Sequence, residues 1–371
     1  MRGPAVQPVV IAAGGTGGHF FPAEALAGVL QARGQRVVLM TDARSAGLTS
    51  AVFANCERFV IQGAGIAGRG PARAIKAMAA LAAGTFQARR ILAGLNAAAV
   101  VGFGGYPSVA PVLATRLLGH RPRVVLHEQN AVLGRANRFL SRHADLLALS
   151  FAATTRVPTW LRSDISGNPV RPAVMDLFGE DYLVPREEIR LLVLGGSLGA
   201  RVFSDIVPPA LALLADAIRV RLVVTQQCRA EDIARVRDAY AVSGVQAELA
   251  AFFPDIADRL AAAHLVIARA GASTVAELAV AGRPSLLVPL PGAIDDHQRA
   301  NAAALVDARG ASVLDQAAFT PTALAEQLER WLEEPDQLGH AARCARSIAR
   351  PEAASRLADL VEELVRERAA S

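Results

Sequence analysis

The sequence predicts an α/β protein made of two Rossmann-like domains whose parallel sheets face each other across a cleft. Three observations predict this class. Short apolar runs alternate with helical patterns along the chain, as they do in βαβ units. A strand that runs into paired glycines and then a helix occurs twice, at residues 9–23 and 189–200. The 371 residues are enough for two domains of ordinary size.

The first half of the chain contains six apolar runs that we interpret as strands. They lie at 9–13, 37–41, 59–62, 97–103, 124–127 and 146–150, with helical patterns at 22–32, 72–92 and 108–118. Residues 91–115 carry no charge and have the length of a transmembrane helix. Because glycines and prolines interrupt this stretch, it is interpreted as a buried strand, a turn and a new helix.

The pattern starts again after Gly167-Asn168-Pro169. Residues 189–200 repeat the opening design, and further strands are expected at 222–225, 245–250, 265–268 and 285–288. The final stretch, from residue 351, is an amphipathic helix. We therefore expect domains at 1–170 and 171–350, with the helix 351–371 packing back on the first domain.

Charge is distributed unevenly along the chain. Residues 1–170 hold 18 Lys and Arg against 6 Asp and Glu, a net charge of +12, whereas residues 171–371 have a net charge of −7. A basic half attracts an anionic partner such as nucleic acid, anionic lipid or a phosphorylated substrate, although a composition bias without a partner is the alternative. Three widely separated cysteines and the absence of a signal peptide pattern favour a reducing compartment without disulfides.

A dinucleotide-binding dehydrogenase is one alternative for the first glycine loop. That loop does not match G-x-G-x-x-G, because Phe20 stands at the last glycine position. The match at 63–68, GAGIAG, has no acidic residue near position 88 and is interpreted as a loop. Asp42 stands where a ribose-binding acid would be, but a histidine at the helix entrance and a second glycine loop are not what NAD requires.

Seven motifs follow one another in a specific order. They are GGTGGHFFPA (14–23), VGFGGYPS (101–108), LHEQNAVLGRAN (126–137), GNPVR (167–171), GGSLGAR (195–201), ARAGASTVAEL (268–278) and DDHQRANA (295–302). Together they resemble the family 28 glycosyltransferases of GT-B fold that act in bacterial peptidoglycan synthesis. The similarity extends from about residue 9 to the C-terminal helix.

The resemblance implies a hexosyltransferase that uses UDP-N-acetylglucosamine and works without a metal or cofactor. It would transfer N-acetylglucosamine, with inversion, to the 4-hydroxyl of lipid I, which is undecaprenyl-diphospho-N-acetylmuramoyl-pentapeptide. The product, lipid II, serves cell wall biogenesis and with it cell shape and division. Three rivals remain: a related GT-B enzyme with another lipid-linked acceptor, a sugar-nucleotide epimerase, and a non-catalytic UDP-sugar-binding protein.

The donor is expected to bind mainly to the second half of the chain. A glycine loop that leads into a helix N-terminus suits a diphosphate, although ordinary strand–helix turns share the pattern. The resemblance assigns the ribose to Glu277 and the uracil edge to the backbone of Ile256; a helix-stabilising Glu277 is the alternative. The full expected donor set is Thr16, Gly17, Gly18, Asn130, Arg171, Ser197, Ile256, Ala272, Ser273, Thr274, Val275, Ala276, Glu277 and Gln298.

His19 is the expected catalytic base. A neutral imidazole can take the proton of an attacking alcohol, and the surrounding glycines leave room for a bulky acceptor. A histidine that only caps the helix is the alternative. Glu128 is expected to orient either the acceptor or His19. Asp295, Asp296 and His297 resemble a metal site, but we expect none there. Leu198 and Ser273 depart from residues common in the family.

The basic first half is expected to bind an anionic membrane surface, where the acceptor resides. Basic and apolar residues interleave in the expected patch, a composition suited to such a surface. The patch comprises Arg69, Arg73, Ile75, Lys76, Phe86, Arg89 and Arg90. The expected location is peripheral, on the cytoplasmic face of the inner membrane, with other cell-wall synthesis proteins as further partners and no nucleic acid.

Overall fold

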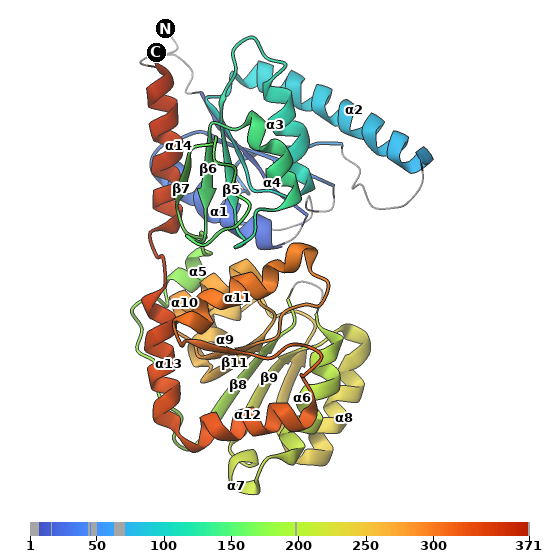
Figure 1. Cartoon of the computed structure of the whole chain (residues 1–371), viewed down its shortest axis with the longest axis vertical. Coiled ribbons are helices and arrows are strands. Elements are labelled where there is room, and N and C mark those ends of the chain that lie inside the picture. The colour runs from blue at the N-terminus through green and yellow to red at the C-terminus, as the bar shows by residue number, and fades with distance from the viewer. Residues whose placement is uncertain are drawn as a thin grey trace. The chain divides into compact units, whose positions relative to one another are not determined.

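Each half of the chain folds around its own parallel β-sheet (Figure 1). The computed structural model describes residues 7–15, 17–43, 45, 50–62, 71–196 and 199–369. It divides into unit 1, Met1–Arg171 with Glu352–Ser371, and unit 2, Pro172–Pro351. The C-terminal segment therefore belongs to the same unit as the N-terminal half.

The sheet of unit 1 has the strand order β3-β2-β1-β4-β5-β6-β7 among the described residues, and all neighbouring strands are parallel. Its strands are β1 (Val9–Ala12), β2 (Val37–Thr41), β3 (Glu57–Val60), β4 (Ala99–Gly102), β5 (Arg123–Glu128), β6 (Leu146–Leu149) and β7 (Ser163–Ile165). The strand order reverses direction between β1 and β4. In open α/β sheets, ligands bind beside the carboxyl ends of the strands at such a switch point.

Helices cover both faces of this sheet because side chains alternate along each strand. Val9 and Ile11 of β1 pack toward α1 (Gly17–Ala32) and α14 (Ala353–Ala369), whereas Val10 packs on the opposite face. The helices of that opposite face are α2 (Pro71–Leu95), α3 (Val109–Thr115) and α4 (Arg135–Leu140). Strands buried on both faces read as continuous apolar runs, which is why the sequence revealed them.

Unit 2 repeats this design with the strand order β10-β9-β8-β11-β12-β13 in the part that the structure describes. Its strands are β8 (Ile189–Leu194), β9 (Leu222–Gln227), β10 (Gln246–Ala250), β11 (Leu265–Ala268), β12 (Ser285–Leu287) and β13 (Ala311–Val313). The switch point lies between β8 and β11. Its helices are α5 (Pro172–Met175), α6 (Arg201–Leu213), α7 (Asp216–Arg219), α8 (Ile233–Ser243), α9 (Ile256–Ala262), α10 (Ala272–Ala281), α11 (His297–Asp307), α12 (Pro321–Glu333) and α13 (Pro335–Ser347).

The structure corrects several expected boundaries. α1 begins at Gly17 rather than at residue 22, so His19 lies in its first turn. Pro22 is the sixth residue of this helix, where it removes one backbone hydrogen bond. Residues 91–115 form the end of α2, β4, a 3₁₀ turn η1 (Tyr106–Ser108) and α3. No helix in the described part of the chain is both long enough and apolar enough to span a membrane.

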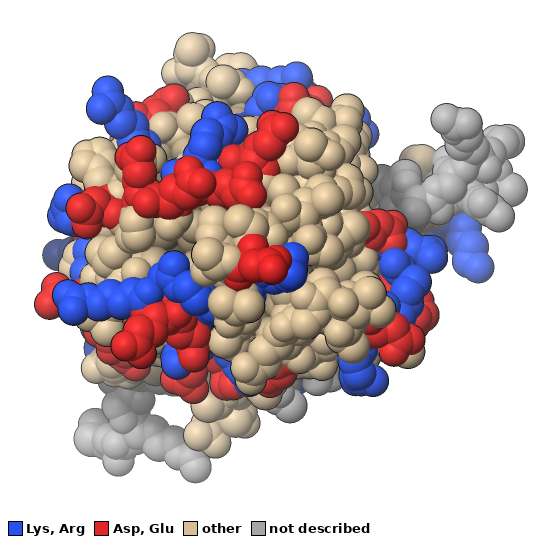
Figure 2. All heavy atoms as spheres, turned by 90° about the horizontal axis from the view of Figure 1, so that it is seen from below, with Lys and Arg blue, Asp and Glu red and all other residues tan. Residues whose placement is uncertain are grey.

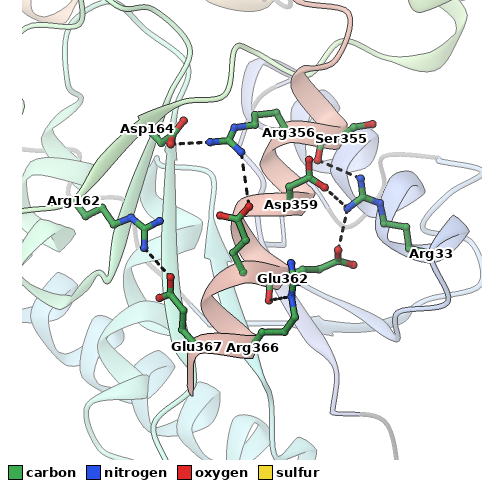
Figure 3. A network of polar contacts seen from close by, with 10 residues as sticks. Arg33, Arg162, Asp164, Ser355, Arg356, Asp359, Glu362, Arg366 and Glu367 are labelled. Atoms are coloured by element: carbon green, nitrogen blue, oxygen red, sulfur yellow. Dashed lines mark hydrogen bonds and ion pairs between the residues drawn. The ribbon is translucent and has the colours of Figure 1, made fainter. Parts of the chain in front are cut away.

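The C-terminal helix α14 packs along unit 1. Its apolar face buries Leu357, Leu360, Val361 and Leu364 in the same core as α1 and the sheet. Figure 3 shows the polar contacts at its border, where Arg33, which directly follows α1, bonds Asp359 at 2.7 Å and Glu362 at 3.0 Å. The helix thus closes one face of the first sheet.

Candidate functional site

The loops at the switch point of unit 1 meet at His19. This residue follows the glycine loop after β1, and its imidazole lies against Gly105, which follows β4. A Cβ built on Gly105 would lie 3.2 Å from both Cδ2 and Nε2 of His19. Gly105 also has a φ of 64°, a conformation that favours glycine. Glycine is therefore required where the two loops meet.

The other side of the His19 ring contacts Gln129, which follows β5. His19 Nδ1 lies 3.0 Å from Gln129 Oε1, and Gln129 Nε2 lies 3.0 Å from His127 Nδ1. His127 Nε2 in turn lies 3.0 Å from the carbonyl oxygen of Gly167. A chain of hydrogen bonds thus connects His19, at the end of the sheet, to the backbone of the 166–168 segment.

His127 is fully buried and packs against the ring of Phe103, with 5.3 Å between the ring centroids. Burial lowers the pKa of His127 to about 4, because the charged imidazolium would lose its hydration; the bond to the Gly167 carbonyl partly offsets this effect. The nearby His19 adds a small lowering. His127 is consequently neutral at neutral pH.

Glu128 organises the loop in which it lies. Its Oε1 accepts hydrogen bonds from the backbone and side-chain amides of Asn130, and its Oε2 accepts from Gly134 N and Asn137 Nδ2. The expected role for Glu128 included orienting His19, but the residue that bonds His19 is Gln129. Successive residues of an extended chain point in opposite directions, which explains why one neighbour faces the loop and the other faces His19.

Two further expected donor residues of unit 1 lie close to the start of α1. A Cβ on Gly17 would come within 2.8 Å of the Phe21 ring, so a larger residue there would displace this side chain. The guanidinium of Arg171 lies over the same ring, 4.1 Å from its centroid, as in a cation–π pair. Gly18 lies in the first turn of α1, and Thr16 is outside the described residues.

The switch point of unit 2 holds the second glycine loop. A Cβ on Gly195 would meet the backbone nitrogen of Ala200 at 2.3 Å, and Gly196 and Gly199 have φ values of 82° and 68°. The loop leads into α6, whose N-terminus has no side-chain cap. Uncapped backbone N–H groups at a helix start suit an anionic oxygen. Ser197 and Leu198 lie outside the described residues.

The second half of this switch point is the turn between β11 and α10. The expected residues Ala272, Ser273, Thr274, Val275, Ala276 and Glu277 form the first turns of α10. Asn301 is fully buried and donates a hydrogen bond to the Ala270 carbonyl at 3.2 Å, which braces the turn. The Glu277 carboxylate is largely buried, with 7% exposure.

The remaining expected donor residues, Ile256 and Gln298, lie at the starts of two helices of unit 2, α9 and α11. Gln298 accepts a hydrogen bond from Leu290 N at 3.0 Å. Ile256 is the first residue of α9 and half-buried, so its N–H belongs to those that a helix start leaves unpaired within the helix. Arg269 is buried, and it donates to the carbonyls of Val288 and Pro289.

Asp295 and Asp296 lie in a 3₁₀ turn, η4 (Ile294–Asp296), and His297 is the first residue of α11. His297 Nδ1 lies 2.8 Å from the Ile294 carbonyl, and Arg299 pairs with Asp296 at 3.2 Å. In the described part of the chain no group of three or more His, Cys, Asp or Glu side chains is arranged to hold a metal ion.

The expected membrane patch lies mostly on α2, which extends away from the sheet of unit 1 in Figure 1. Ile75, Met78 and Phe86 are 68%, 70% and 61% exposed, and their spacing places them on one face of the helix. Lys76, Arg89 and Arg90 are exposed beside them. Arg69 and the side chain of Arg73 lie outside the described residues.

Other parts of the surface mix charges of both signs. Figure 2 shows such a face, where acidic and basic side chains lie next to one another. In unit 2, for example, Arg219 pairs with Asp216 and Arg235 pairs with Asp205. The described length of α2, by contrast, contains no acidic residue.

Each of the two Rossmann-like units has a glycine loop at its switch point, an arrangement suited to a nucleotide phosphate. The glycosyltransferase family 28 N-terminal domain matches residues 9–148, and the family 28 C-terminal domain matches residues 190–364. The chain belongs to glycosyltransferase family 28. The predicted fold class and the predicted glycosyltransferase class are thereby confirmed.

The relatives carry a more specific name. The chain is 60% identical to the UDP-N-acetylglucosamine–N-acetylmuramyl-(pentapeptide) pyrophosphoryl-undecaprenol N-acetylglucosamine transferase of Granulibacter bethesdensis, over 98% of this chain and 95% of the relative. It is 56% identical to the enzyme of that name from Acidiphilium cryptum, over 99% of this chain and 100% of the relative. The crystal structure of Acinetobacter baumannii MurG is similar with a TM-score of 0.76 at 32% identity, covering 96% and 99% of the two chains.

Sequence reasoning missed Gln129 as a site residue. It lies within the motif LHEQN, between two residues that were selected, Glu128 and Asn130. A glutamine has no titratable group and gave no chemical signal of its own. The strand-end alternation was the available signal, since His127 and Gln129 share one side of the chain.

Proposed function

We propose that this enzyme transfers N-acetylglucosamine from UDP-N-acetylglucosamine to the 4-hydroxyl of lipid I and forms lipid II. The observation that carries this proposal is the 60% identity, over nearly the whole of both chains, to a transferase named for this reaction. At this identity the acceptor and the donor of the relative are the first candidates for this chain.

The proposed chemistry is a single displacement that inverts the anomeric carbon. The acceptor hydroxyl gives its proton to Nε2 of His19 while its oxygen forms a bond to C1 of N-acetylglucosamine. The bond between C1 and the phosphate oxygen breaks, and its electron pair leaves with UDP. Two observations support this role for His19. Its Nδ1 lies 3.0 Å from Gln129 Oε1, and its Nε2 lies beside Gly105, which has no side chain.

The proposed donor site uses the loops of unit 2. The uncapped start of α6 would stabilise the diphosphate as negative charge grows on it. Ser197 and Arg171 would donate further hydrogen bonds to the phosphate oxygens. Glu277, buried in the first turns of α10, would accept the ribose hydroxyls, and the Ile256 backbone would bind the uracil edge. Gln298 and residues 272–276 would contact the sugar and nucleoside; in unit 1, Thr16, Gly17, Gly18 and Asn130 would complete the set.

We also propose that the enzyme acts as a peripheral protein on the cytoplasmic face of the inner membrane. The described length of α2 combines exposed apolar side chains with Lys76, Arg89 and Arg90, without an acid. Such a surface gains both from apolar burial and from attraction to anionic lipid. A lipid-linked acceptor requires that its enzyme work at that surface, where other cell-wall synthesis proteins would also be encountered.

The proposal is tested with labelled UDP-N-acetylglucosamine and a short-chain lipid I analogue. We expect one equivalent of UDP for each labelled disaccharide-lipid product, and no turnover without the acceptor. Epimerisation at C2 of the donor sugar in the absence of acceptor would instead identify an epimerase. Binding of UDP without either reaction would identify a UDP-sugar-binding protein.

A further inference from the structure

We propose that Gln129, held by the buried His127, is the positioning residue that keeps His19 in the tautomer with a proton on Nδ1 and a lone pair on Nε2. This inference rests on the proposed function, in which Nε2 of His19 takes the acceptor proton. Neither Gln129 nor His127 would touch the reacting atoms.

The direction of the hydrogen-bond chain follows from its buried end. The Gly167 carbonyl can only accept, so His127 Nε2, 3.0 Å away, carries the ring proton and donates it. A neutral imidazole has one proton, which makes His127 Nδ1 an acceptor. Ser150 Oγ lies 3.5 Å from the same Nε2 and does not change this assignment, since its hydroxyl can accept as well.

The second step assigns the amide of Gln129. Its nitrogen lies 3.0 Å from His127 Nδ1 and 3.4 Å from the His127 backbone carbonyl, and both of these atoms are acceptors. Only the NH₂ end of the amide can satisfy them. The carbonyl end, Oε1, therefore points to His19 and must receive a proton from His19 Nδ1 at 3.0 Å.

The third step concerns the free nitrogen of His19. With the proton on Nδ1, the lone pair is on Nε2, which lies together with Cδ2 beside Gly105. The reverse tautomer would place two acceptors, Nδ1 and Oε1, against each other inside the protein. That arrangement would leave polar groups without hydrogen bonds, which is costly in a buried site. The chain of bonds consequently favours one tautomer of the base.

Burial is what makes this arrangement stable against protonation. If His127 carried a second proton, its Nδ1 would become a donor and the Gln129 amide would have to turn. Because His127 is fully buried, protonation of its ring is unfavourable, and the pKa of this ring is accordingly lowered.

The first experiment observes the tautomer directly. The full-length enzyme is labelled with ¹⁵N in its histidine rings, and long-range ¹H–¹⁵N spectra are recorded at pH 7.5, with the His19→Ala variant to assign the signal. We expect His19 to carry its proton on Nδ1 in the wild type. We expect this preference to disappear in Gln129→Leu. If His19 in the wild type carries its proton on Nε2, the proposal is overturned. This spectrum alone decides, so the result does not depend on whether variants of Gln129 or His127 fold.

The second experiment measures kcat and KM with the soluble acceptor analogue. Gln129→Leu keeps the side-chain size and removes the hydrogen bonds of the amide to His19 and His127, so we expect kcat to fall roughly ten- to a hundredfold, less than the loss of the base itself. The donor KM should stay within threefold. Gln31→Leu is the matched control, because Gln31 lies in the same unit and bonds Val52 and Cys56 instead. That control should behave like the wild type.

A double-mutant cycle tests whether His127 acts through Gln129. His127→Phe preserves a ring against Phe103 but removes the acceptor for Gln129. We expect His127→Phe to lower kcat, and the double variant with Gln129→Leu to be no slower than Gln129→Leu alone. Fully additive losses would contradict the chain of action.

The outcomes separate this inference from the proposed function. If His19→Ala loses less than threefold in kcat, His19 is not the base and the proposed mechanism fails. If His19→Ala loses 10²- to 10⁴-fold but Gln129→Leu keeps full kcat, the mechanism stands and the positioning role of Gln129 is overturned.

Discussion

At the scale of single residues, His127 and Glu128 show that hydrogen-bond partners distinguish a buried neutral group from a buried charged one. His127 and Glu128 are neighbours and both are buried, yet their surroundings differ. His127 faces Gln129 and a carbonyl, which suits a neutral ring, whereas Glu128 accepts bonds from four N–H groups of its loop, which suits a carboxylate. The two residues therefore contribute to the site in different ways.

The buried His127 predicts a dependence of stability on pH. Its folded pKa of about 4 lies below the unfolded value of 6.5, so the unfolded chain binds an extra proton between these values. The wild type should thus lose roughly 3 kcal/mol of stability as pH falls from 6.5 to 4, a loss that His127→Phe escapes. Hydrogen exchange of the buried β1 and β4 amides in increasing urea measures this for unit 1. An identical pH profile for both proteins would contradict the prediction.

Glu277 gives a second prediction at this scale. If its carboxylate accepts the ribose hydroxyls, Glu277→Ala should raise the donor KM roughly ten- to a hundredfold, because hydrogen bonds to a charged group contribute about 1.5–3 kcal/mol. Asp336→Ala, which removes an exposed acid from the first turn of α13, is the control and should leave KM unchanged. If Glu277→Ala lowers the melting temperature but leaves the donor KM unaltered, Glu277 stabilises the helix and does not bind the ribose.

At the scale of elements, α2 combines two faces of different character. Ala88 and Leu92 pack into the core of unit 1, while Ile75, Met78 and Phe86 remain exposed. A soluble surface rarely exposes three large apolar side chains along one helix, so this face fits a partner surface. The neighbouring cations indicate an anionic one.

We predict that replacing Lys76, Arg89 and Arg90 by Gln weakens binding to anionic vesicles about a hundredfold at low salt. Each cation near such a surface contributes about 1 kcal/mol, and tenfold in affinity corresponds to 1.4 kcal/mol. Sedimentation with phosphatidylglycerol vesicles measures the effect. Phe86→Ser should weaken binding even at high salt, where the charges are screened.

The control neutralises three exposed arginines of unit 2, Arg186, Arg237 and Arg343, and should bind like the wild type. Activity on a soluble acceptor analogue should change little in every variant. Wild-type binding that is equal on neutral and anionic vesicles would contradict an electrostatic role for α2.

At the scale of the whole molecule, the chain returns from unit 2 to complete unit 1. α14 contributes both apolar packing and ion pairs, and their magnitudes differ. The Arg33 pairs are partly exposed, at 31% for Arg33 and 45% and 24% for its partners, so each contributes about 1 kcal/mol or less. Leu357 is fully buried in the core. Packing should therefore dominate the attachment of α14.

This comparison gives a prediction for unit 1. Leu357→Ala should lower its free energy of unfolding by about 2–5 kcal/mol, whereas Arg33→Ala should lower it by about 1 kcal/mol. The same hydrogen-exchange measurement on the β1 and β4 amides of unit 1 gives both free energies. A larger loss for Arg33→Ala than for Leu357→Ala would show that the ion pairs hold the helix.

The sequence by itself determined the class of fold, most strands and the order of the motifs, because strands buried on both faces leave continuous apolar runs and glycine loops leave a compositional trace. It missed β7 and β13, which are three residues long and partly exposed, so they show no apolar run. It also began α1 too late, at Pro22.

Only the tertiary structure decided which side chains meet. His19, Gly105, Gln129 and Gly167 come from four separate segments, which follow the parallel strands β1, β4, β5 and β7 at the same end of the sheet. The sequence shows that His19 follows a glycine loop. Whether Glu128 or Gln129 bonds His19 depends on the direction in which each side chain points at the end of β5. The physical reason is that hydrogen bonds are short and directional, so distances of 3 Å between residues far apart in the chain are determined by the packing of the whole unit.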